Sequence, residues 1–476
     1  MARRRRRYGL PLVVLVLAVL LTGTLLGGAG AAHPRADAGT AGSVPPTANP
    51  PGALTALATN APAPSTAGLR AALDGLVRAK ALRPALVGAV MDVQTGRLPY
   101  QLSVNVAVPP ASTTKLVTAA AALTWLGPDT VFRTRTLLAT NPRATPTVAL
   151  VGGGDPTLAG PRAALLPYPA VSRLTNLVKA TAAGLVARHA RTVRVVVDDR
   201  LFSGPRTAPG WKPSYLTEGD VSPVTALSVD AGRLRPDSNP KTPDDRALDP
   251  TITAGRDFAA LLSRAGIHVV GAVRRGAVAS TGPLLASVSS PTVAALVTRM
   301  LQQSDNDVAE SLFRHLAIVQ HEPGSFVGGA IVVRQWLRRL NVDVRAVELV
   351  DGSGLSLRDR LSPAVLTAVL LAATAAGNPT LRPIVAALPV AGFSGTLSSR
   401  YRALPQKVLP VAGAGVVRAK TGTLTGVSAL AGLIEDHAGR LLAFAFVAPA
   451  VRLGGLTAAE RALDRLAAQL SACGCR

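Results

Sequence analysis

Three short polar segments, set far apart along the chain, constrain its fold more than any other feature. The first opens a predicted helix, the second separates two predicted helices, and the third closes a predicted strand. Ser304 follows Ser112 by 192 positions, which leaves room for further domains between them. A fold that unites the segments is therefore discontinuous in sequence. The segments are Ser112-Thr113-Thr114-Lys115, Ser304-Asp305-Asn306 and Lys420-Thr421-Gly422-Thr423.

The first segment pairs a hydroxyl with an amine. Ser112 and Lys115 stand three residues apart at the start of a helix predicted over 112–122, so their side chains share a face. A serine hydroxyl becomes a nucleophile when a neighbouring base takes its proton. Lysine is such a base when burial or another cation lowers its pKa. The same four residues also fit an N-capping serine followed by a solvated lysine.

The second segment lies between helices predicted over 292–302 and 307–319. A serine in such a loop can relay a proton to a leaving group, and an asparagine carboxamide can hold a substrate amide. These roles fall to Ser304 and Asn306. The alternative is a polar Asx turn that only breaks the two helices.

The third segment ends a strand predicted over 416–420. Lys420 and Thr421 suit a carboxylate, and Gly422 allows close approach of another backbone. The Thr423 N–H can serve as a second oxyanion donor beside that of Ser112. A strand edge can also pair with an extended peptide. The alternative is an ordinary turn between two strands.

Lysine is scarce in a chain that is otherwise rich in arginine. Only seven of the 51 basic residues are lysine, and Lys115 and Lys420 are two of them. Arginine stays protonated in proteins, whereas lysine loses its proton when it is buried or crowded by charge. The choice of lysine at these positions favours a chemical use of the amine.

The formal charge of +24 favours anionic partners such as nucleic acid, acidic lipid or an anionic wall polymer. The basic residues are scattered, however, and no patch interleaves them with aromatic residues. We therefore predict no nucleic-acid partner. A GC-rich genome, whose codons favour arginine, explains the charge equally well.

The N-terminus has the pattern of an export signal. Arg3 to Arg7 precede an apolar run over 10–26, and Ala29-Gly30-Ala31 fits a cleavage site. Residues 1–32 are predicted to be a signal peptide or an uncleaved membrane anchor, and 33–66 a Pro/Ala-rich linker. Either way the remainder is expected to be extracytoplasmic, secreted or anchored on the cell-wall side.

Periodicity predicts a mixed α/β chain beyond the linker. Residues 128–285 mix strands, helices and Pro-rich loops and have the character of an insertion. Two cysteines, Cys473 and Cys475, are too close for an unstrained disulfide and predict a frayed thiol tail. The predicted elements are a hairpin over 87–100, strands over 132–139, 148–151, 193–198, 428–434 and 441–447, and helices over 69–82, 171–187, 329–340 and 457–471.

Taken together and in this order, the three segments match the joint signature of penicillin-binding proteins and class A β-lactamases. The chain from about 69 to 472 resembles the low-molecular-mass class C penicillin-binding proteins, the D-alanyl-D-alanine carboxypeptidase/endopeptidase family. The resemblance also rests on four further segments: Gly153-Gly154-Asp155-Pro156-Thr157-Leu158, Asp351-Gly352-Ser353-Gly354-Leu355-Ser356, Leu361-Ser362-Pro363 and Leu388-Pro389-Val390-Ala391-Gly392.

This resemblance implies a transpeptidase-like catalytic domain, with an antiparallel sheet flanked by helices and an all-helical lobe. The catalytic domain would comprise 67–127 and 286–476, with smaller accessory domains inserted over 128–285. The activity implied is that of a serine D-Ala-D-Ala carboxypeptidase or endopeptidase. Its partners would be peptidoglycan stem peptides that end in D-Ala-D-Ala, and β-lactams, which would acylate it. No metal or cofactor is expected.

The resemblance also implies roles for individual residues. Ser112 would be the acylated nucleophile, Lys115 the general base and Ser304 the proton shuttle. Asn306 would anchor the substrate, with Lys420, Thr421, Gly422 and Thr423 along the substrate strand. Asp155 would meet an amine on the side chain of the stem peptide. The chain departs from the family at Leu357, where arginine is usual; Arg358 follows it.

Two alternatives share the fold. A β-lactamase would add a base and a positioned water for fast deacylation, but the 192-position gap is far longer than that class needs and no matching glutamate pattern is visible. A non-catalytic wall-binding protein would not need all of the polar residues of the three segments.

Overall fold

The computed structural model describes residues 61–141, 143–161, 163, 169–236, 245–277, 282–401 and 413–475. The predicted signal or anchor (1–32) and most of the predicted linker lie outside these ranges. Within them no single helix is long and apolar enough to cross a membrane; only a bent pair, Pro363–Thr374 with Pro379–Ala387, meets the length and composition needed.

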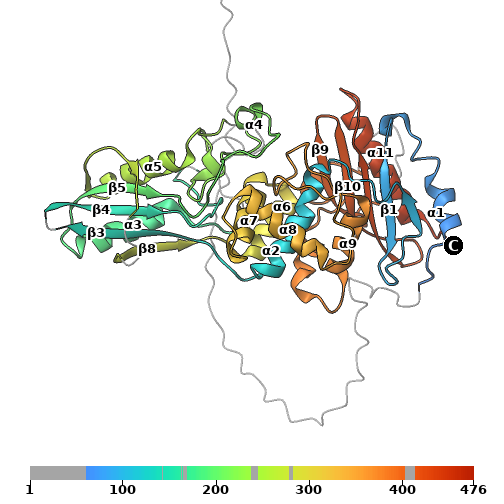
Figure 1. The fold of residues 1–476 in the computed structure, drawn as a ribbon, viewed down its shortest axis with the longest axis horizontal. Coiled ribbons are helices and arrows are strands. Elements are labelled where there is room, and N and C mark those ends of the chain that lie inside the picture. The colour runs from blue at the N-terminus through green and yellow to red at the C-terminus, as the bar shows by residue number, and fades with distance from the viewer. Residues whose placement is uncertain are drawn as a thin grey trace, which may run out of the picture. The chain divides into compact units, whose positions relative to one another are not determined.

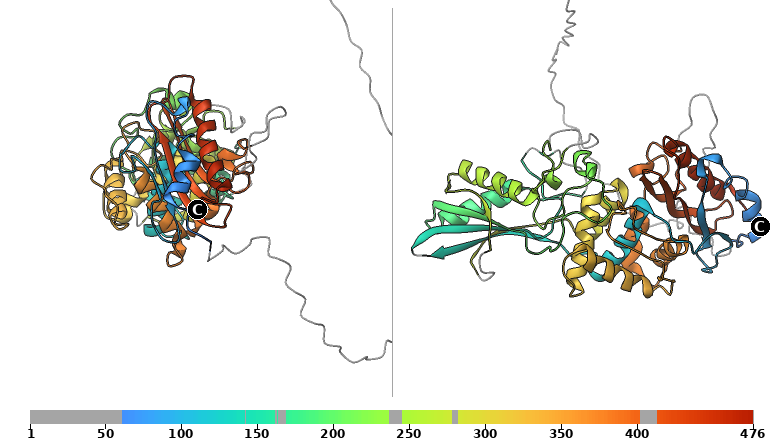
Figure 2. Two further views of the ribbon diagram at one scale, coloured as in Figure 1. Left: turned by 90° about the vertical axis from the view of Figure 1, so that its right-hand side faces the viewer. Right: turned by 45° about the horizontal axis from the view of Figure 1, so that its top comes forward.

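An antiparallel sheet of five strands, ordered β2-β1-β11-β10-β9, joins the start of the described chain to its end. Strand β9 stands at one edge and pairs with β10 through a tight turn, with Leu424 opposite Val427. One face of the sheet packs on α1 (Thr66–Leu73) and on α11 (Leu456–Ala472), as Figure 2 shows. The strands are β1 (Val87–Asp92), β2 (Tyr100–Leu102), β9 (Arg418–Leu424), β10 (Val427–Glu435) and β11 (Leu441–Ala448).

The other face of this sheet packs on a group of helices around α2 (Thr114–Trp125). Residues 114–123 of α2 are all buried, as expected of a helix that is apolar on every side. Figure 1 shows this group between the two sheets of the protein. The other helices are α6 (Val293–Gln303), α7 (Asn306–Val319), α8 (Phe326–Arg338), α9 (Pro363–Thr374) and α10 (Arg382–Ala387).

A second, mixed sheet has the order β6-β5-β4-β3-β8, with β7 also paired to β5. Alternate residues of β5, Val193, Val195 and Val197, pack against α3 (Leu174–Val186) and α5 (Pro250–Arg264). The strands are β3 (Arg133–Asn141), β4 (Ala144–Val151), β5 (Thr192–Asp198), β6 (His268–Val269), β7 (Arg274–Arg275) and β8 (Leu284–Ser289). Strand β8 carries this sheet past the predicted boundary at residue 285. A short helix, α4 (Ser214–Thr217), lies in the long segment between β5 and α5.

Two predictions near the start of the described chain are wrong in detail. The helix predicted over 69–82 ends at Leu73, and only a 3-10 turn follows at Lys80–Leu82. The predicted linker extends too far, because Ser65 already caps α1 by accepting a hydrogen bond from the Gly68 N–H. Ala61 is buried, and its carbonyl accepts from Arg440.

The prediction of a frayed thiol tail is also wrong. Cys475 is buried against the α1 and α11 side of the first sheet, and its carbonyl accepts a hydrogen bond from the Ser65 N–H. Cys473 and Cys475 are placed as a disulfide pair. The burial of Cys475 and its backbone bond to Ser65 fix the tail.

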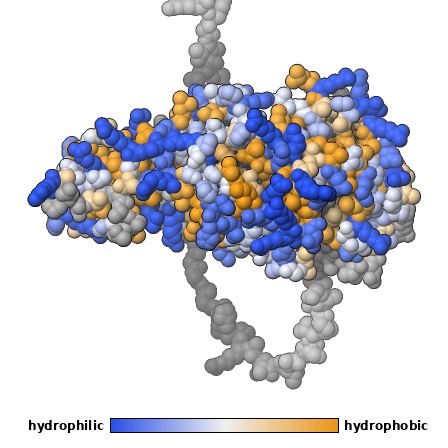
Figure 3. All heavy atoms as spheres, viewed as in Figure 1, coloured by the Kyte–Doolittle hydropathy of each residue, from blue (hydrophilic) through white to orange (hydrophobic). Residues whose placement is uncertain are grey.

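Hydrophilic residues are scattered over the surface and do not form a single patch on the face shown in Figure 3. On the face seen in Figure 3, hydrophilic residues spread over the regions of both sheets, with hydrophobic residues dispersed among them.

Candidate active site

Ser112 and Lys115 meet at the start of α2, as their spacing predicts. Ser112 lies in a 3-10 turn, Ala111–Thr113, that leads into the helix. The Lys115 Nζ donates a hydrogen bond to Ser112 Oγ at 3.0 Å. The amine is thus placed to exchange a proton with the hydroxyl.

Lys115 is buried and surrounded by oxygen acceptors. Besides Ser112 Oγ, its Nζ donates to Asn306 Oδ1 at 2.6 Å and to the Ser353 carbonyl at 2.7 Å. Burial lowers its pKa to about 8, against the opposing effect of carboxylates, of which Glu310 has the largest influence. With that pKa, about a tenth of the amine is neutral at pH 7. Lys115 can therefore act as a base near neutrality.

The second segment faces this pair from the junction of α6 and α7. Ser304 adopts a left-handed backbone conformation (φ 58°) that ends α6, and Asp305 caps α7 by accepting from the Val308 N–H. Asn306 bridges two parts of the site, since its Nδ2 donates to the Asp220 carbonyl while its Oδ1 accepts from Lys115. The junction is an Asx-type cap as well as a part of the site.

Lys420 joins the third segment to the second. Its Nζ donates to Ser304 Oγ at 3.0 Å and to the Thr421 carbonyl at 2.9 Å. Burial, together with the nearby charge of Lys115, holds the pKa of Lys420 well below its usual range. The two lysines are therefore close enough for the charge of one to oppose that of the other.

The remainder of β9 presents small and hydroxyl side chains. Thr421 Oγ1 donates to Thr396 Oγ1 at 2.8 Å, and Thr423 Oγ1 donates to Glu460 Oε1 at 2.8 Å. Gly422 lies against the turn before Ser112, where an added Cβ would stand 2.9 Å from the Pro110 carbonyl oxygen. Glycine allows this close approach.

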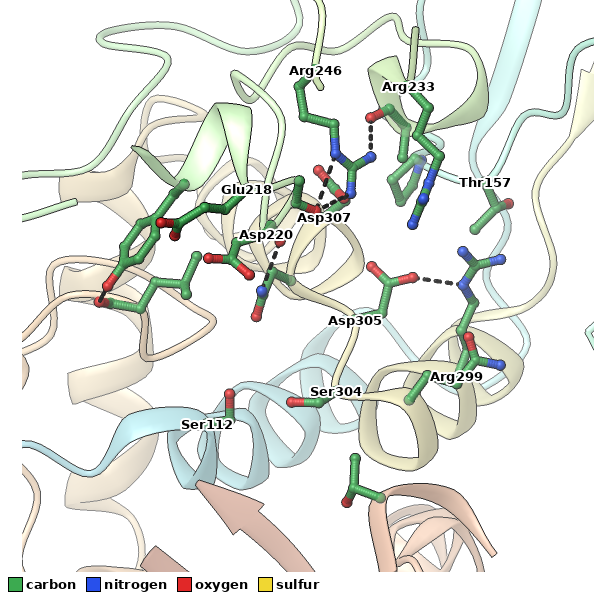
Figure 4. A pocket seen from close by; sticks show the side chains of 18 of the residues that line it. Ser112, Thr157, Glu218, Asp220, Arg233, Arg246, Arg299, Ser304, Asp305 and Asp307 are labelled. Carbon is green, nitrogen blue, oxygen red and sulfur yellow. Dashed lines mark hydrogen bonds and ion pairs between the residues drawn. The ribbon is translucent and has the colours of Figure 1, made fainter. Parts of the chain in front are cut away.

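Ser112, Ser304, Asn306 and Thr423 line one cavity of about 1000 Å³, whereas Lys115, Lys420 and Thr421 are not part of its lining. Figure 4 shows Ser112 and Ser304 at one side of it and a set of charged side chains at the other. Two ion pairs lie there, Arg299 with Asp305 at 2.7 Å and Arg246 with Asp307 at 3.4 Å. The segment between β5 and α5 also contributes walls. The lining also includes Asp220, Thr396 and the four residues of these two ion pairs.

Asp155 does not line this cavity, although its neighbours Pro156 and Thr157 do. Its Oδ1 accepts from the Thr157 N–H at 2.8 Å and from Thr157 Oγ1 at 2.6 Å, and burial raises its pKa. Its described bonds thus stabilise its own turn. The predicted contact with a substrate amine stays a prediction. Leu357 and Arg358, where the chain departs from the family, also lie outside the cavity lining.

The sequence analysis did not identify the hydrogen bonds that hold the loop next to Lys115. The Glu310 carboxylate accepts from the Gly352 and Ser353 N–H groups, and Asp351 accepts from Gly354 N–H and from the Trp211 indole at 2.7 Å. The segment 351–356 was recognised only as part of a resemblance, without a role. The available signal was an acidic residue four positions after Asn306, on the same face of a predicted helix.

The sequence is similar to that of known carboxypeptidases. Residues 69–247 and 232–470 match the family described as D-Ala-D-Ala carboxypeptidase 3 (S13). The chain belongs to the peptidase S13 family. It is 35% identical to carboxypeptidase DacB of Mycolicibacterium smegmatis over 98% of this chain and 96% of the relative. It is 30% identical to a D-alanyl-D-alanine carboxypeptidase of Actinomadura sp. over 80% of each chain.

Among solved structures, penicillin-binding protein 4 of Haemophilus influenzae aligns with a TM-score of 0.67 and 22% identity. The alignment covers 84% of this chain and 99% of that protein. The likeness confirms the predicted α/β fold of the penicillin-binding-protein type. Membership of the S13 family confirms the resemblance inferred from the three segments.

Proposed function

We propose that this S13 enzyme is a serine D-Ala-D-Ala carboxypeptidase that acts on peptidoglycan stem peptides through an acyl-enzyme on Ser112. One observation carries the proposal: the buried Lys115 amine lies 3.0 Å from the Ser112 hydroxyl, at the wall of a cavity that Ser304 and Thr423 share. A hydroxyl, a base of lowered pKa and a second hydroxyl bonded to a second lysine are the parts that acyl transfer requires.

Acylation begins when neutral Lys115 takes the proton of Ser112. The Ser112 Oγ then attacks the carbonyl carbon of the penultimate D-alanine. Backbone N–H groups of Ser112 and Thr423 stabilise the oxyanion. Ser304, bonded to Lys420, gives its hydroxyl proton to the nitrogen of the leaving D-alanine and regains a proton through the lysines. The C–N bond breaks and the ester on Ser112 remains.

Deacylation reverses the direction of these transfers. A water molecule gives a proton to Lys115 and attacks the ester carbonyl carbon, and Ser112 leaves with a proton. The shortened stem peptide is released as a carboxylate. Before acylation, Thr421 and Thr396, whose hydroxyls lie 2.8 Å apart beside buried Lys420, bind the terminal carboxylate of the substrate. Asn306 holds the preceding amide.

The same acylation chemistry accepts two other ligands. In an endopeptidase reaction the leaving nitrogen belongs to a cross-linked peptide, and in a β-lactam it belongs to the strained ring. A β-lactam leaving group stays tethered, so its acyl-enzyme is expected to persist. The reaction places the enzyme on the cell-wall side of the membrane, with 1–32 as the export signal or anchor.

The test is release of D-alanine from a soluble pentapeptide that ends in D-Ala-D-Ala, measured for wild type and Ser112→Ala. Release by wild type and its loss in the variant are expected. No release by folded wild-type protein would contradict the proposal. Rapid steady turnover of a chromogenic cephalosporin, without peptide cleavage, would indicate a β-lactamase instead.

A further inference from the structure

Glu310 is a buried carboxylate that the mechanism above does not use. It lies on α7, four residues after Asn306, and is fully buried. Its Oε2 accepts from the Gly352 N–H at 2.9 Å and its Oε1 from the Ser353 N–H at 2.9 Å. One carboxylate thus holds two consecutive backbone amides of a loop that lies 42 residues further along the chain.

The carbonyls of the same two loop residues point toward α2. The Ser353 carbonyl accepts from Lys115 Nζ at 2.7 Å, and the Gly352 carbonyl accepts from Thr118 Oγ1 at 2.7 Å. Glu310 therefore accepts hydrogen bonds from the N–H groups of this backbone segment, and side chains of α2 donate hydrogen bonds to its carbonyls. A displaced loop would move an acceptor of the Lys115 amine.

The loop also lies hard against the turn that carries Ser112. Gly354 has φ +79°, and a Cβ there would stand 2.0 Å from the Ala111 carbonyl oxygen. Such close packing transmits small shifts. A shift of the loop would therefore be felt at both Ser112 and Lys115.

Glu310 also acts on Lys115 by charge. Of the carboxylates whose charge raises the pKa of Lys115, Glu310 comes first, followed by Asp351, Asp305 and Asp359. The charge of Lys115 in turn lowers the pKa of Lys420. Burial and the charge of Asp351 raise the pKa of Glu310, whereas the Ser353 and Gly352 N–H groups and the charge of Lys115 favour its ionised form.

We propose that Glu310 is the positioning residue for Lys115. It fixes the Gly352–Ser353 backbone so that the Ser353 carbonyl keeps the amine against Ser112, and its charge sets the pH at which Lys115 becomes a base. The inference rests on the proposed role of Lys115. An amide cannot replace this carboxylate, because its NH₂ group would face one of the two loop N–H donors.

The experiment compares acylation rates across pH. The second-order rate constant for labelling by a fluorescent penicillin is measured from about pH 5 to pH 9. In wild type the rate rises with pH as Lys115 loses its proton. Glu310→Gln should lower the plateau that this rate constant reaches at high pH by roughly tenfold or more, because the loop is no longer held. It should also move the rising limb of the profile, the pH range over which the rate increases, to lower pH, because a negative charge near the amine is removed.

Two variants separate positioning from charge. Thr118→Val removes the hydrogen bond to the Gly352 carbonyl but no charge. The plateau of the labelling rate should therefore fall, while the pH at which the rate rises stays the same. Glu310→Asp keeps the charge but shortens its reach, so it should also lower the plateau without moving the limb to lower pH. It serves as the test of position if Glu310→Gln does not fold.

Asp464→Asn is the matched control. This carboxylate is largely buried, pairs with Arg400 at 2.5 Å on α11 and lies outside the cavity lining. Loss of the Asp464 charge should lower the free energy of unfolding without moving the pH range over which the labelling rate rises. A folded Glu310→Gln protein with the wild-type profile, or with a uniform loss and an unmoved limb, would overturn the proposal. If wild type itself is not acylated, the proposed function fails rather than this inference.

Discussion

Lys420 on β9 donates a hydrogen bond to Ser304 at the α6–α7 junction, across 116 residues of sequence. The amine of Lys420 is buried, with a pKa held well below its usual range by burial and by Lys115. Two serine–lysine pairs thus share one site, and the charge of Lys115 acts on Lys420.

Replacement of Lys420 is expected to lower the rate of acylation without moving its pH profile. Because the pKa of Lys420 lies well below its usual range, Lys420→Gln removes little charge at the pH where Lys115 titrates, so the rising limb of acylation should stay in place. Loss of the Ser304 partner should lower the rate by roughly 100-fold or more. Lys179→Gln, a change on α3, should leave the labelling profile unchanged. A labelling rate of Lys420→Gln equal to that of wild type would contradict the role of Lys420 as the partner of Ser304.

Gly354 is expected to tolerate no side chain. Gly354→Ala adds a Cβ against the Ala111 carbonyl and places alanine at φ +79°. The backbone conformation alone costs about 1–3 kcal/mol. Gly266→Ala is the control, since Gly266 has φ +82° with nothing within 4 Å of its added Cβ. Both variants should lose stability in urea unfolding, but only Gly354→Ala should also lose penicillin labelling. Equal labelling of the two would contradict the close packing.

The ion pair of Arg440 with Asp92 should stabilise the fold far from the site. Their side chains are 7% and 3% exposed, with Arg440 Nη2 2.6 Å from Asp92 Oδ2. Burial raises the pKa of Asp92, but bonds from Arg440, Thr95 and Gln94 outweigh it and leave the pKa below 3.8. Arg440→Met should cost about 3–5 kcal/mol at neutral pH, because it leaves a buried charge unpaired.

The pH dependence of that cost has a definite sign. In wild type the lowered pKa of Asp92 gives stability that is present above its ordinary pKa and is lost as the pH falls through the folded value. Without Arg440, burial raises the pKa of Asp92, so acidification neutralises the unpaired charge. The deficit of Arg440→Met in urea unfolding should therefore shrink from pH 7 toward about pH 4. A deficit that grows on acidification would contradict this assignment.

Local patterns predicted some of the contacts within the candidate site. Ser112 and Lys115 share a helix, so their contact follows from helical geometry alone, and the apolar strand before Lys420 predicted β9. Glu310 could not be placed in the same way, because its partners Gly352 and Ser353 come from a distant loop. The predicted contact of Asp155 with a substrate amine stays a prediction, and its described bonds are local.

Other differences also have physical causes. Helix α9 (Pro363–Thr374) is apolar on almost every side, so it shows little amphipathic period to identify it. Helix α1 ends early at Leu73, just before Asp74, whose carboxylate accepts from Tyr100 at 3.1 Å on strand β2. The tail with Cys475 is fixed by Ser65, a contact across nearly the whole described chain. In both cases partners distant in sequence decided the outcome.

The most direct test of the account is intact-mass analysis of the protein after β-lactam treatment, followed by peptide mapping. One stoichiometric adduct is expected on wild type, on the peptide that contains Ser112, and none on Ser112→Ala. A folded wild-type protein without an adduct, or an adduct that persists on the variant, would contradict the assignment of Ser112 as the nucleophile.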